Sequence, residues 1–491
     1  GLTGALTGVT IKINKASGTT TTALNWVTSV DFNGDATADV VDPGQMLDPT
    51  QALVIDYTGE VVSFAAVVEL DILGIIKVKA SFALQEIDVD VDADGNGAID
   101  TGYDNAKLKT FAISVDPLAD PTQYVTIQVG GVGVSITSGN VVIALVESTT
   151  TGTRSYVAVR ADNIQAHVIG LPDTIDLALT GISFEYNAAS DTAIATPAAL
   201  DWTKALDIDG ASTNALTFAD TVDPGQELPD PKELPITFTS SVFRIKAGGS
   251  LNIAGNVIAL IPAGGLQVDI GTADVITGNS SITGLGAVDG QIDDANVLSF
   301  SITNASLFVG AGGALNEDRS AVLTTGATGF LVTGASFAMS SVSKGTVSFT
   351  GLEASISNAS LIGVSGVDVS VSGSVKVNKS SLLNGARIDW VTATDISNDP
   401  SELISDALTL TSADELTATG SGSLNIGGNV VAVVNNLTLK IATADVITGN
   451  AAIVGLGSRA GLIEDARVLS FSITGASLFV GVGGSLSGDR S

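Results

Sequence analysis

The chain has 491 residues, of which 45% are apolar and 15% are charged, and its formal net charge is −31. This apolar fraction excludes bulk disorder, and the negative charge argues against nucleic acid or an anionic membrane surface as a ligand. The chain contains no cysteine, which excludes disulfides, thiolate metal sites and thiol nucleophiles.

The sequence is built from long repeats. The segment Thr272–Asn279 returns letter for letter at Thr443–Asn450, and Asn296–Ser320 returns with few changes at Arg467–Ser491. A period of roughly 170 to 190 residues with this fidelity predicts tandem repeats of one architecture.

Three landmarks recur in every repeat: a strand-like segment, a single Trp after it, and a second strand-like segment that begins with an acidic residue. In chain order they are Thr10–Ser17, Trp26 and Asp104–Ser114; Ser183–Ser190, Trp202 and Asp293–Thr303; and Ser374–Ser381, Trp390 and Glu464–Thr474. They predict repeat 1 over residues 1–180, repeat 2 over 181–371 and a truncated repeat 3 over 372–491. No Pro-rich or Ser-rich linker separates the repeats, so we expect one continuous stack.

The composition predicts an all-β fold, because Val, Ile, Leu and Ala supply most of the apolar residues and no long run has helical spacing. A shorter pattern of aliphatic, hydroxyl, Asn or Gly, Ala, Ser and apolar residues begins at Ile302, Val332, Ile356 and Ile473. Strands punctuated by residues that tolerate left-handed backbone predict an elongated β-solenoid, similar to a parallel β-helix. Tandem β-sandwich domains are the alternative.

A segment after each Trp departs from the strand pattern. Asp31–Pro49 and Asp207–Pro231 share the sequence VDPGQxL, and Asp395–Leu403 holds the same place in repeat 3 without that motif. The Pro-Gly pair predicts a turn. We therefore expect surface loops that vary between repeats, while the Trp residues themselves are expected to be core anchors.

The sharpest local signal for a ligand is the acidic segment Asp88–Asn105. Oxygen ligands alternate along it, and Ca²⁺ takes about six to eight such ligands in flexible geometry. The candidate metal ligands are Asp90, Asp92, Asp94, Asn96, Asp100 and Asp104. The segment resembles the DxDGNGxID loops of calcium-binding repeats, but Tyr103 stands where an EF-hand loop requires a bidentate acid. We predict a structural Ca²⁺ here, with a solvated acidic turn as the alternative; Asp31–Asp39 is a weaker second candidate.

Nothing in the sequence predicts an enzyme. His167 is the single histidine, and no GxSxG motif precedes a helix, which argues against a Ser-His-Asp hydrolase. The acid pair Asp293–Asp294 stands at a strand start, where solvating a turn is a simpler role than glycoside hydrolysis. No apolar run reaches membrane-spanning length without polar interruption, so we expect no membrane insertion.

The Gly-, Ser-, Thr-, Ala-, Val- and Asp-rich repeats, the NASL and TGAS segments and the DxDGNG loop resemble giant repetitive extracellular proteins of bacteria. Those proteins include large adhesins and filament- or sheath-forming surface proteins. The resemblance implies secretion, Ca²⁺-assisted rigidity and a role at the cell surface or in a matrix.

We therefore expect a structural protein that forms a rigid, acidic filament, stalk or surface layer. It is expected either to self-associate end to end or to belong to a longer chain. The alternative is a Ca²⁺-dependent adhesin that binds carbohydrate or a partner surface through the loops after Trp26, Trp202 and Trp390.

Overall fold

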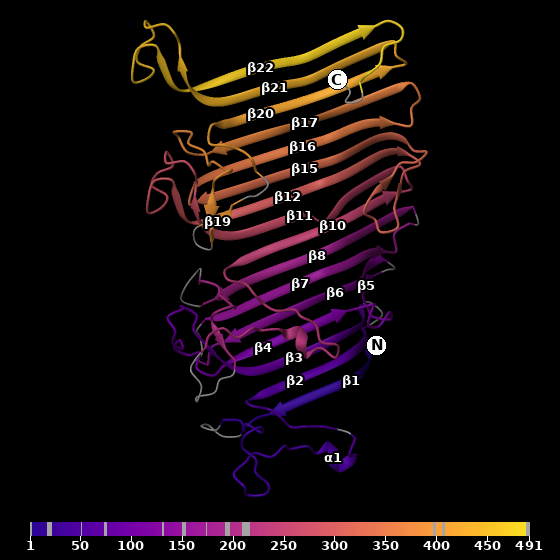
Figure 1. The fold of residues 1–491 in the computed structure, drawn as a ribbon, viewed down its shortest axis with the longest axis vertical. Helices are drawn as coiled ribbons and strands as arrows, with labels where there is room; N and C mark the ends of the chain where they lie inside the picture. The colour runs from indigo at the N-terminus through magenta and orange to yellow at the C-terminus, as the bar shows by residue number, and fades with distance from the viewer. Residues whose placement is uncertain are drawn as a thin grey trace. The chain divides into compact units, whose positions relative to one another are not determined.

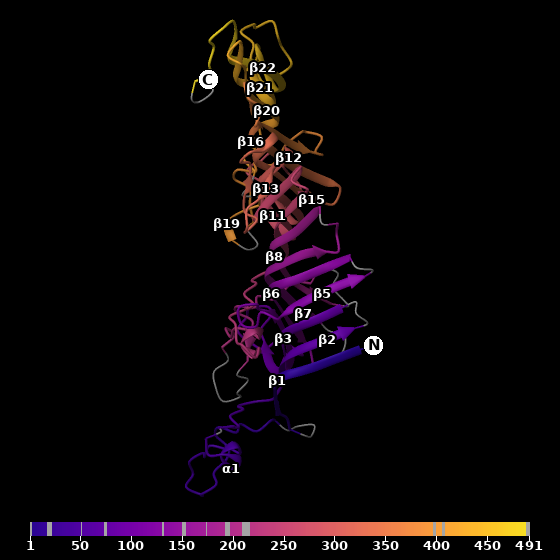
Figure 2. The same cartoon turned by 90° about the vertical axis from the view of Figure 1, so that its right-hand side faces the viewer.

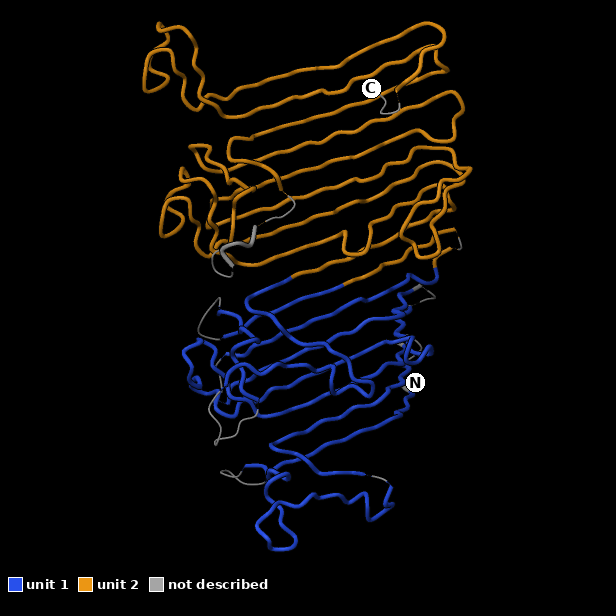
Figure 3. Tube along the Cα trace, viewed as in Figure 1, with its two compact units in different colours: residues 1–170, 183–243 blue, residues 171–182, 244–491 orange. Residues whose placement is uncertain are grey.

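The computed structural model describes residues 2–16, 22–50, 52–72, 76–129, 132–149, 154–172, 174–191, 197–208, 217–395, 399–404 and 408–487. Strands make up 59% of the protein and helices 2%, which confirms the all-β prediction. The chain divides into two compact units, shown in Figure 3: unit 1 (residues 1–170 and 183–243) and unit 2 (residues 171–182 and 244–491). No helix within the described ranges has the length and apolar character needed to cross a membrane.

Unit 1 is built on long antiparallel strands (Figure 1). They are β1 (Leu2–Asn14), β2 (Val61–Ile72), β3 (Ile76–Val91), β4 (Ala106–Val115), β5 (Tyr124–Val129), β6 (Val132–Glu147) and β7 (Ser155–Ile169), with the short β9 (Leu206–Asp207). Pairing runs from β1 through β2, β3, β4 and β6 to β7, and β5 pairs with both β3 and β6. The helical segments are two short turns, α1 (Gly44–Leu47) and the 3₁₀ turn η1 (Pro224–Glu227).

Unit 2 is also antiparallel. Its long strands are β11 (Val257–Ile276), β12 (Gln291–Ala311), β15 (Thr328–Lys344), β16 (Val347–Ile362), β17 (Val367–Ser380), β20 (Asp414–Ile426), β21 (Val430–Ile447) and β22 (Leu462–Val480), which pair in that order. The short strands are β13 (Ala314–Leu315), β14 (Val322–Leu323), β18 (Thr394–Asp395) and β19 (Asp399–Leu403). β8 (Ile175–Ser190) and β10 (Val242–Ile253) contribute residues to both units.

The strand direction corrects the expected parallel solenoid, because consecutive strands pair antiparallel. Ala254 and Gly255 join β10 to β11 with φ of 51° and 69°, and Gly427 and Gly428 join β20 to β21 with φ of 58° and 69°. Positive φ at both central positions gives the type I′ turn that joins antiparallel neighbours directly, whereas parallel strands need a long crossover. The long strands of each unit belong to one sheet rather than to a sandwich of two.

The shorter sequence pattern marks β-bulges rather than the corners of solenoid coils. Asn304 has a φ of 54°, and the β12–β15 register shifts between Ile302 and Ala305. Gly334 and Gly475, at the same place in the pattern, have φ of 61° and 62°. A bulge inserts an extra residue into a strand, and its left-handed form favours Gly or Asn. The pattern therefore interrupts the pairing of long strands without ending them.

A loop covers part of the sheet in each unit. In unit 1, Trp202 and the residues after it pack on β3, β4, β6 and β7, in a buried cluster that includes Leu108 and Val146. Figure 2 shows this loop, in magenta, on one face of the strands of unit 1. In unit 2, Trp390 and its neighbours pack on β11, β12, β15 and β16. The expected surface loop Asp207–Pro231 therefore contributes Val222 and Leu228 to the core, whereas Leu47 of Asp31–Pro49 is exposed as expected.

The compact units do not follow the sequence repeats. Trp202 belongs to repeat 2 but packs on strands of repeat 1, and Trp390 belongs to repeat 3 but packs on strands of repeat 2. Unit 1 accordingly extends to residue 243, past the repeat boundary at residue 180. The Trp202 and Trp390 loops therefore act as clamps on the strands that precede them.

Candidate functional site: a loop clamp and an acidic cluster

A buried asparagine holds the base of each clamp. The Nδ2 of Asn378 donates to two backbone oxygens, those of Ile388 (2.8 Å) and Thr411 (2.9 Å). Its Oδ1 accepts from Nε1 of Trp390 at 3.1 Å. Asn378 has no exposed surface, so three hydrogen bonds compensate the burial of its amide.

The same hydrogen bonds occur in the other two repeats. Asn187 bonds to Trp202, Leu200 and Ser240, and Asn14 bonds to Trp26, Leu24 and Gly59. Sequence reasoning missed these three asparagines. The available signal was their identical place in the first landmark of each repeat, ahead of the single Trp.

The Trp202 loop is fastened to unit 1 by backbone and side-chain contacts. Its short strand β9 pairs with the end of β3, which sets Asp207 opposite Asp90. Lys232 Nζ lies 2.5 Å from the Asp116 carboxylate. This hydrogen-bonded ion pair lowers the pKa of Asp116 and raises the pKa of Lys232. The clamp therefore adds a charge pair to its apolar contacts.

The Trp390 loop is fastened to the connection between β11 and β12. Asn279 Nδ2 donates to the backbone oxygen of Arg387 at 2.8 Å, and the backbone N–H of Asp389 donates to the oxygen of Thr277 at 2.9 Å. These bonds use the backbone of the loop, so they do not depend on which side chains the loop carries.

The acidic cluster forms at the end of β3. Oxygen atoms of Asp92, Asp94 and Asp100 all lie within 4.8 Å of one another. Asp92 is buried, and its carboxylate accepts from the backbone N–H groups of Asn96 (3.0 Å) and Gly97 (2.7 Å). Three converging carboxylates fit Ca²⁺, with carbonyl oxygens and water available to complete its coordination.

Of the other three candidate ligands, two bind Asn105 and one binds a member of the cluster. Asp90 accepts from the backbone N–H of Asn105 at 2.8 Å, and Asp104 accepts from Asn105 Nδ2 at 2.6 Å. Burial raises the pKa of Asp90, and the charges of Asp104 and Asp88 add to that effect. Asn96 donates its Nδ2 to Asp94 at 3.0 Å. Of the five predicted carboxylate ligands, Asp92, Asp94 and Asp100 therefore converge, and Asn96 lies beside them through its bond to Asp94.

Tyr103, at the position where an EF-hand loop has its last acid, is buried and donates to the backbone oxygen of Arg154 at 2.5 Å. Burial raises its pKa. No helix flanks the acidic segment in the described residues around it. Both features separate this loop from an EF-hand, as the sequence predicts.

The acidic cluster adjoins the Trp202 clamp. The backbone N–H of Asp92 donates to the oxygen of Ala205, next to β9, at 2.9 Å. The connection that carries the cluster links β3 to β4, and the one held by the Trp390 loop links β11 to β12. Asn105, at the end of the unit 1 connection, and Asp294, near the start of β12 in unit 2, both have positive φ. An ion bound at the cluster would therefore stiffen the β3–β4 connection, which the Trp202 loop contacts.

The second acidic segment makes no such cluster among the residues described. Asp31 accepts from the backbone N–H groups of Gly34 (2.7 Å) and Ala36 (2.9 Å), and these bonds lower its pKa. Asp39 accepts from the backbone N–H of Phe32 at 2.7 Å. Its carboxylates therefore stabilise their own loop.

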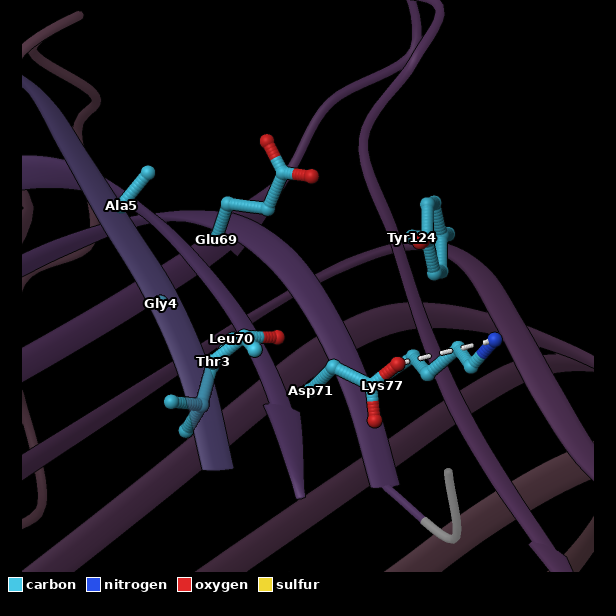
Figure 4. A pocket seen from close by; sticks show the side chains of 8 residues that line it. All are labelled: Thr3, Gly4, Ala5, Glu69, Leu70, Asp71, Lys77 and Tyr124. Atoms are coloured by element: carbon cyan, nitrogen blue, oxygen red, sulfur yellow. Dashed lines mark ion pairs between the residues drawn. The ribbon is translucent and has the colours of Figure 1, made fainter. Parts of the chain in front are cut away.

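Two further features are the single histidine and an open cavity on unit 1. His167 lies on β7, opposite Ser135 of β6. Figure 4 shows an open cavity of about 450 Å³ on unit 1, where Lys77 pairs with Asp71 at 3.7 Å beside Glu69 and Tyr124. None of the residues that line this cavity is a histidine or a serine.

Comparison with known proteins adds no relative: no family model matches the chain, and neither a curated protein nor a solved structure resembles it significantly.

Proposed function

We propose that this chain is a structural protein of the bacterial exterior, which forms a rigid acidic filament, stalk or surface layer. One observation carries the proposal: a Trp loop of one repeat is buried on the strands of the repeat before it, and this occurs twice. Such a clamp joins successive repeats by a shared apolar core. A chain built this way resists bending and local opening, which suits mechanical work better than catalysis.

The first test of this proposal is the shape of the purified chain in negative-stain electron microscopy. Joined repeats are expected to give rods or filaments. Round compact particles would contradict a structural array, whatever their state of association.

Calcium is proposed to assist the clamp at the Asp92, Asp94 and Asp100 cluster. A ligand that binds the folded state alone stabilises it by about 2.7 kcal/mol at a free concentration 100 times its Kd. We therefore expect Ca²⁺ to raise the melting temperature, and Asp94→Asn to remove most of that increase. Asp94 is exposed, so this change leaves the apolar core intact.

Asp31→Asn is the matched control, because it removes one carboxylate from the other acidic segment. It should keep the wild-type response to Ca²⁺. If EDTA changes neither the melting temperature nor the protease resistance of the wild type, the cluster is a solvated acidic turn.

The second candidate function is a Ca²⁺-dependent adhesin, and exposure restricts it to one loop. Trp202 and Trp390 have no exposed surface, so neither can stack on a sugar as it stands. Trp26 is half-buried, and the nearby Phe32 and Met46 are exposed. Binding to a glycan array that is lost on Trp26→Ala and kept on Leu118→Asp, at an exposed residue of another connection, would favour this function.

A further inference from the structure

The Trp26 loop (residues 22–60) has the same internal architecture as the Trp202 loop. In the Trp26 loop, Asp42 Oδ1 accepts from the N–H groups of Gly44 (3.0 Å) and Leu53 (2.9 Å). In the Trp202 loop, Asp223 Oδ1 accepts from Gly225 (3.1 Å) and Leu234 (2.9 Å). The bridge between Val41 and Ile55 matches that between Val222 and Ile236. The Trp26 loop therefore has the conformation of a docked loop, although no described strand lies beneath it.

Its apolar side chains are nevertheless uncovered. Leu47 is 83% exposed, whereas its counterpart Leu228 is 3% exposed. Leu53 is 59% exposed against 6% for Leu234. Figure 1 shows the reason: α1 lies beyond the β1 edge of the strands of unit 1, where no described strand lies beneath it.

A matching acceptor lies at the other end of the sequence, in the connection between β21 and β22. The backbone N–H of Thr448 donates to the oxygen of Gly461 at 2.8 Å, as Thr277 does to Gly290 at 2.8 Å. Asn450 Oδ1 accepts from its residue i+2 at 3.0 Å, as Asn279 does at 3.0 Å. The acceptor loop therefore has the same conformation as the one that the Trp390 loop covers.

The two connections differ in whether a loop covers them: the Trp390 loop covers the β11–β12 connection, and no described loop covers the β21–β22 connection. Asn279 Nδ2 donates to the Trp390 loop, while Asn450 Nδ2 makes no hydrogen bond with the described residues. A side chain at Gly278 would lie 2.2 Å from Thr392 Oγ1, whereas one at Gly449 would meet nothing within 4 Å. The donor group and the space for a loop are both in place at Asn450.

The apolar residues that a covering loop would bury are preserved in the acceptor as well. Five residues buried under the Trp390 loop are Ala273, Val275, Ile282, Ile292 and Ala295. Their counterparts Ala444, Val446, Ile453, Ile463 and Ala466 are the same residue types, and all five have lost that burial. Apolar residues kept at open positions indicate a surface that is covered by a partner.

Charge favours the Trp26 loop as that partner. The loop contains no Lys or Arg, and it contains Asp31, Asp35, Asp39, Asp42, Asp48 and Asp56. The acceptor carries Arg459 where the covered connection has Val288, while Arg467, which replaces Asn296, is already paired with Glu415 at 2.5 Å. Opposite charges across a contact raise the association rate and select the partner.

We infer that the Trp26 loop of one copy of this chain docks on the β21–β22 connection of a second copy, so that copies associate head to tail. This inference rests on the proposed structural function and names the two surfaces that join. Within unit 2, the Trp390 loop reaches the β11–β12 connection over β15 and β16, which lie between β12 and β17. The same contact between copies is made by the loop and needs no strand pairing.

Two double variants of the full chain test the inference by sedimentation velocity over a concentration series. Leu47→Asp with Leu53→Asp disables the loop, and Asn450→Asp with Arg459→Glu disables the acceptor. All four residues are exposed, so the fold is retained. Wild type is expected to form a concentration-dependent series of oligomers. Loss of a buried anchor weakens association by about 30-fold or more, so each variant alone should be monomeric.

The decisive sample is an equal mixture of the two variants. Each pair then holds one intact loop and one intact acceptor, so dimers should form and nothing larger. Leu118→Asp, at a residue that is 95% exposed in another connection, should associate like wild type.

A wild type that stays monomeric overturns the inference, as do variants that assemble like wild type. Rod-shaped monomers in the microscope would leave the proposed function standing while this inference fails. Loss of glycan binding in the loop variant, without any self-association of the wild type, would assign the loop to adhesion.

Discussion

Replacing Trp390 with alanine is expected to lower the free energy of unfolding by about 3–5 kcal/mol, the cost of removing a fully buried aromatic side chain. Trp390 has no exposed surface and packs among β11, β12, β15 and β16. Its loss also leaves Asn378 Oδ1 without its donor. Urea unfolding followed by circular dichroism measures the change, and hydrogen exchange should increase in residues 386–395 and 408–410.

Trp26→Ala is the matched control for that experiment. Trp26 makes the same bond to an asparagine, but it is half-buried and no strand covers its loop in the described structure. It should therefore cost clearly less than the Trp390 change. Equal costs at the two positions would mean that burial on the preceding repeat contributes little, and the clamp would lose its physical basis.

Asn378→Asp is expected to be the second severe change, although it alters a single atom. Asp has no Nδ2, so the oxygens of Ile388 and Thr411 lose their donor, and each unsatisfied buried group costs about 1–3 kcal/mol. Burial also raises the pKa of a carboxyl at this position. The deficit is therefore smallest at low pH, where the carboxyl is protonated in both states, and grows as pH rises from its unfolded pKa to its folded pKa.

Asn256→Asp provides the comparison, because Asn256 is exposed and its Nδ2 donates one bond of 3.2 Å to the oxygen of Ala254. It should change stability by less than about 0.5 kcal/mol. Melting temperatures of both variants between pH 3 and pH 8 are the measurement. A pH-independent deficit for Asn378→Asp would argue against a buried amide at the base of the clamp.

The acidic segment shows how far local sequence reasoning reaches at the candidate site. Asp92, Asp94 and Asp100 converge because a short glycine-containing turn brings them together, and such local geometry follows from spacing. Asp90 and Asp104 do not join them, because Asn105 adopts a left-handed backbone and binds both. That competition among neighbours cannot be read from ligand spacing.

The strand direction was ambiguous in the sequence for a similar reason. Gly427 and Gly428 tolerate the corner of a solenoid coil as well as they tolerate a type I′ hairpin. The choice depends on whether the next strand returns beside the last one, and that is decided by pairing along β20 and β21. The Asn or Gly of the shorter pattern was ambiguous in the same way until the register shift beside Asn304 identified a bulge.

By itself the sequence determined the β class, the long repeat, the acidic loop and the place of one Trp in each repeat. These properties depend on residue type and short spacing, which act locally. The tertiary structure alone decided that the strands run antiparallel and that Trp202 and Trp390 are buried on the repeat before their own. Burial sums contacts between residues far apart in the chain, such as Trp202 with Leu108 and Val146. No local pattern records which of those residues will meet.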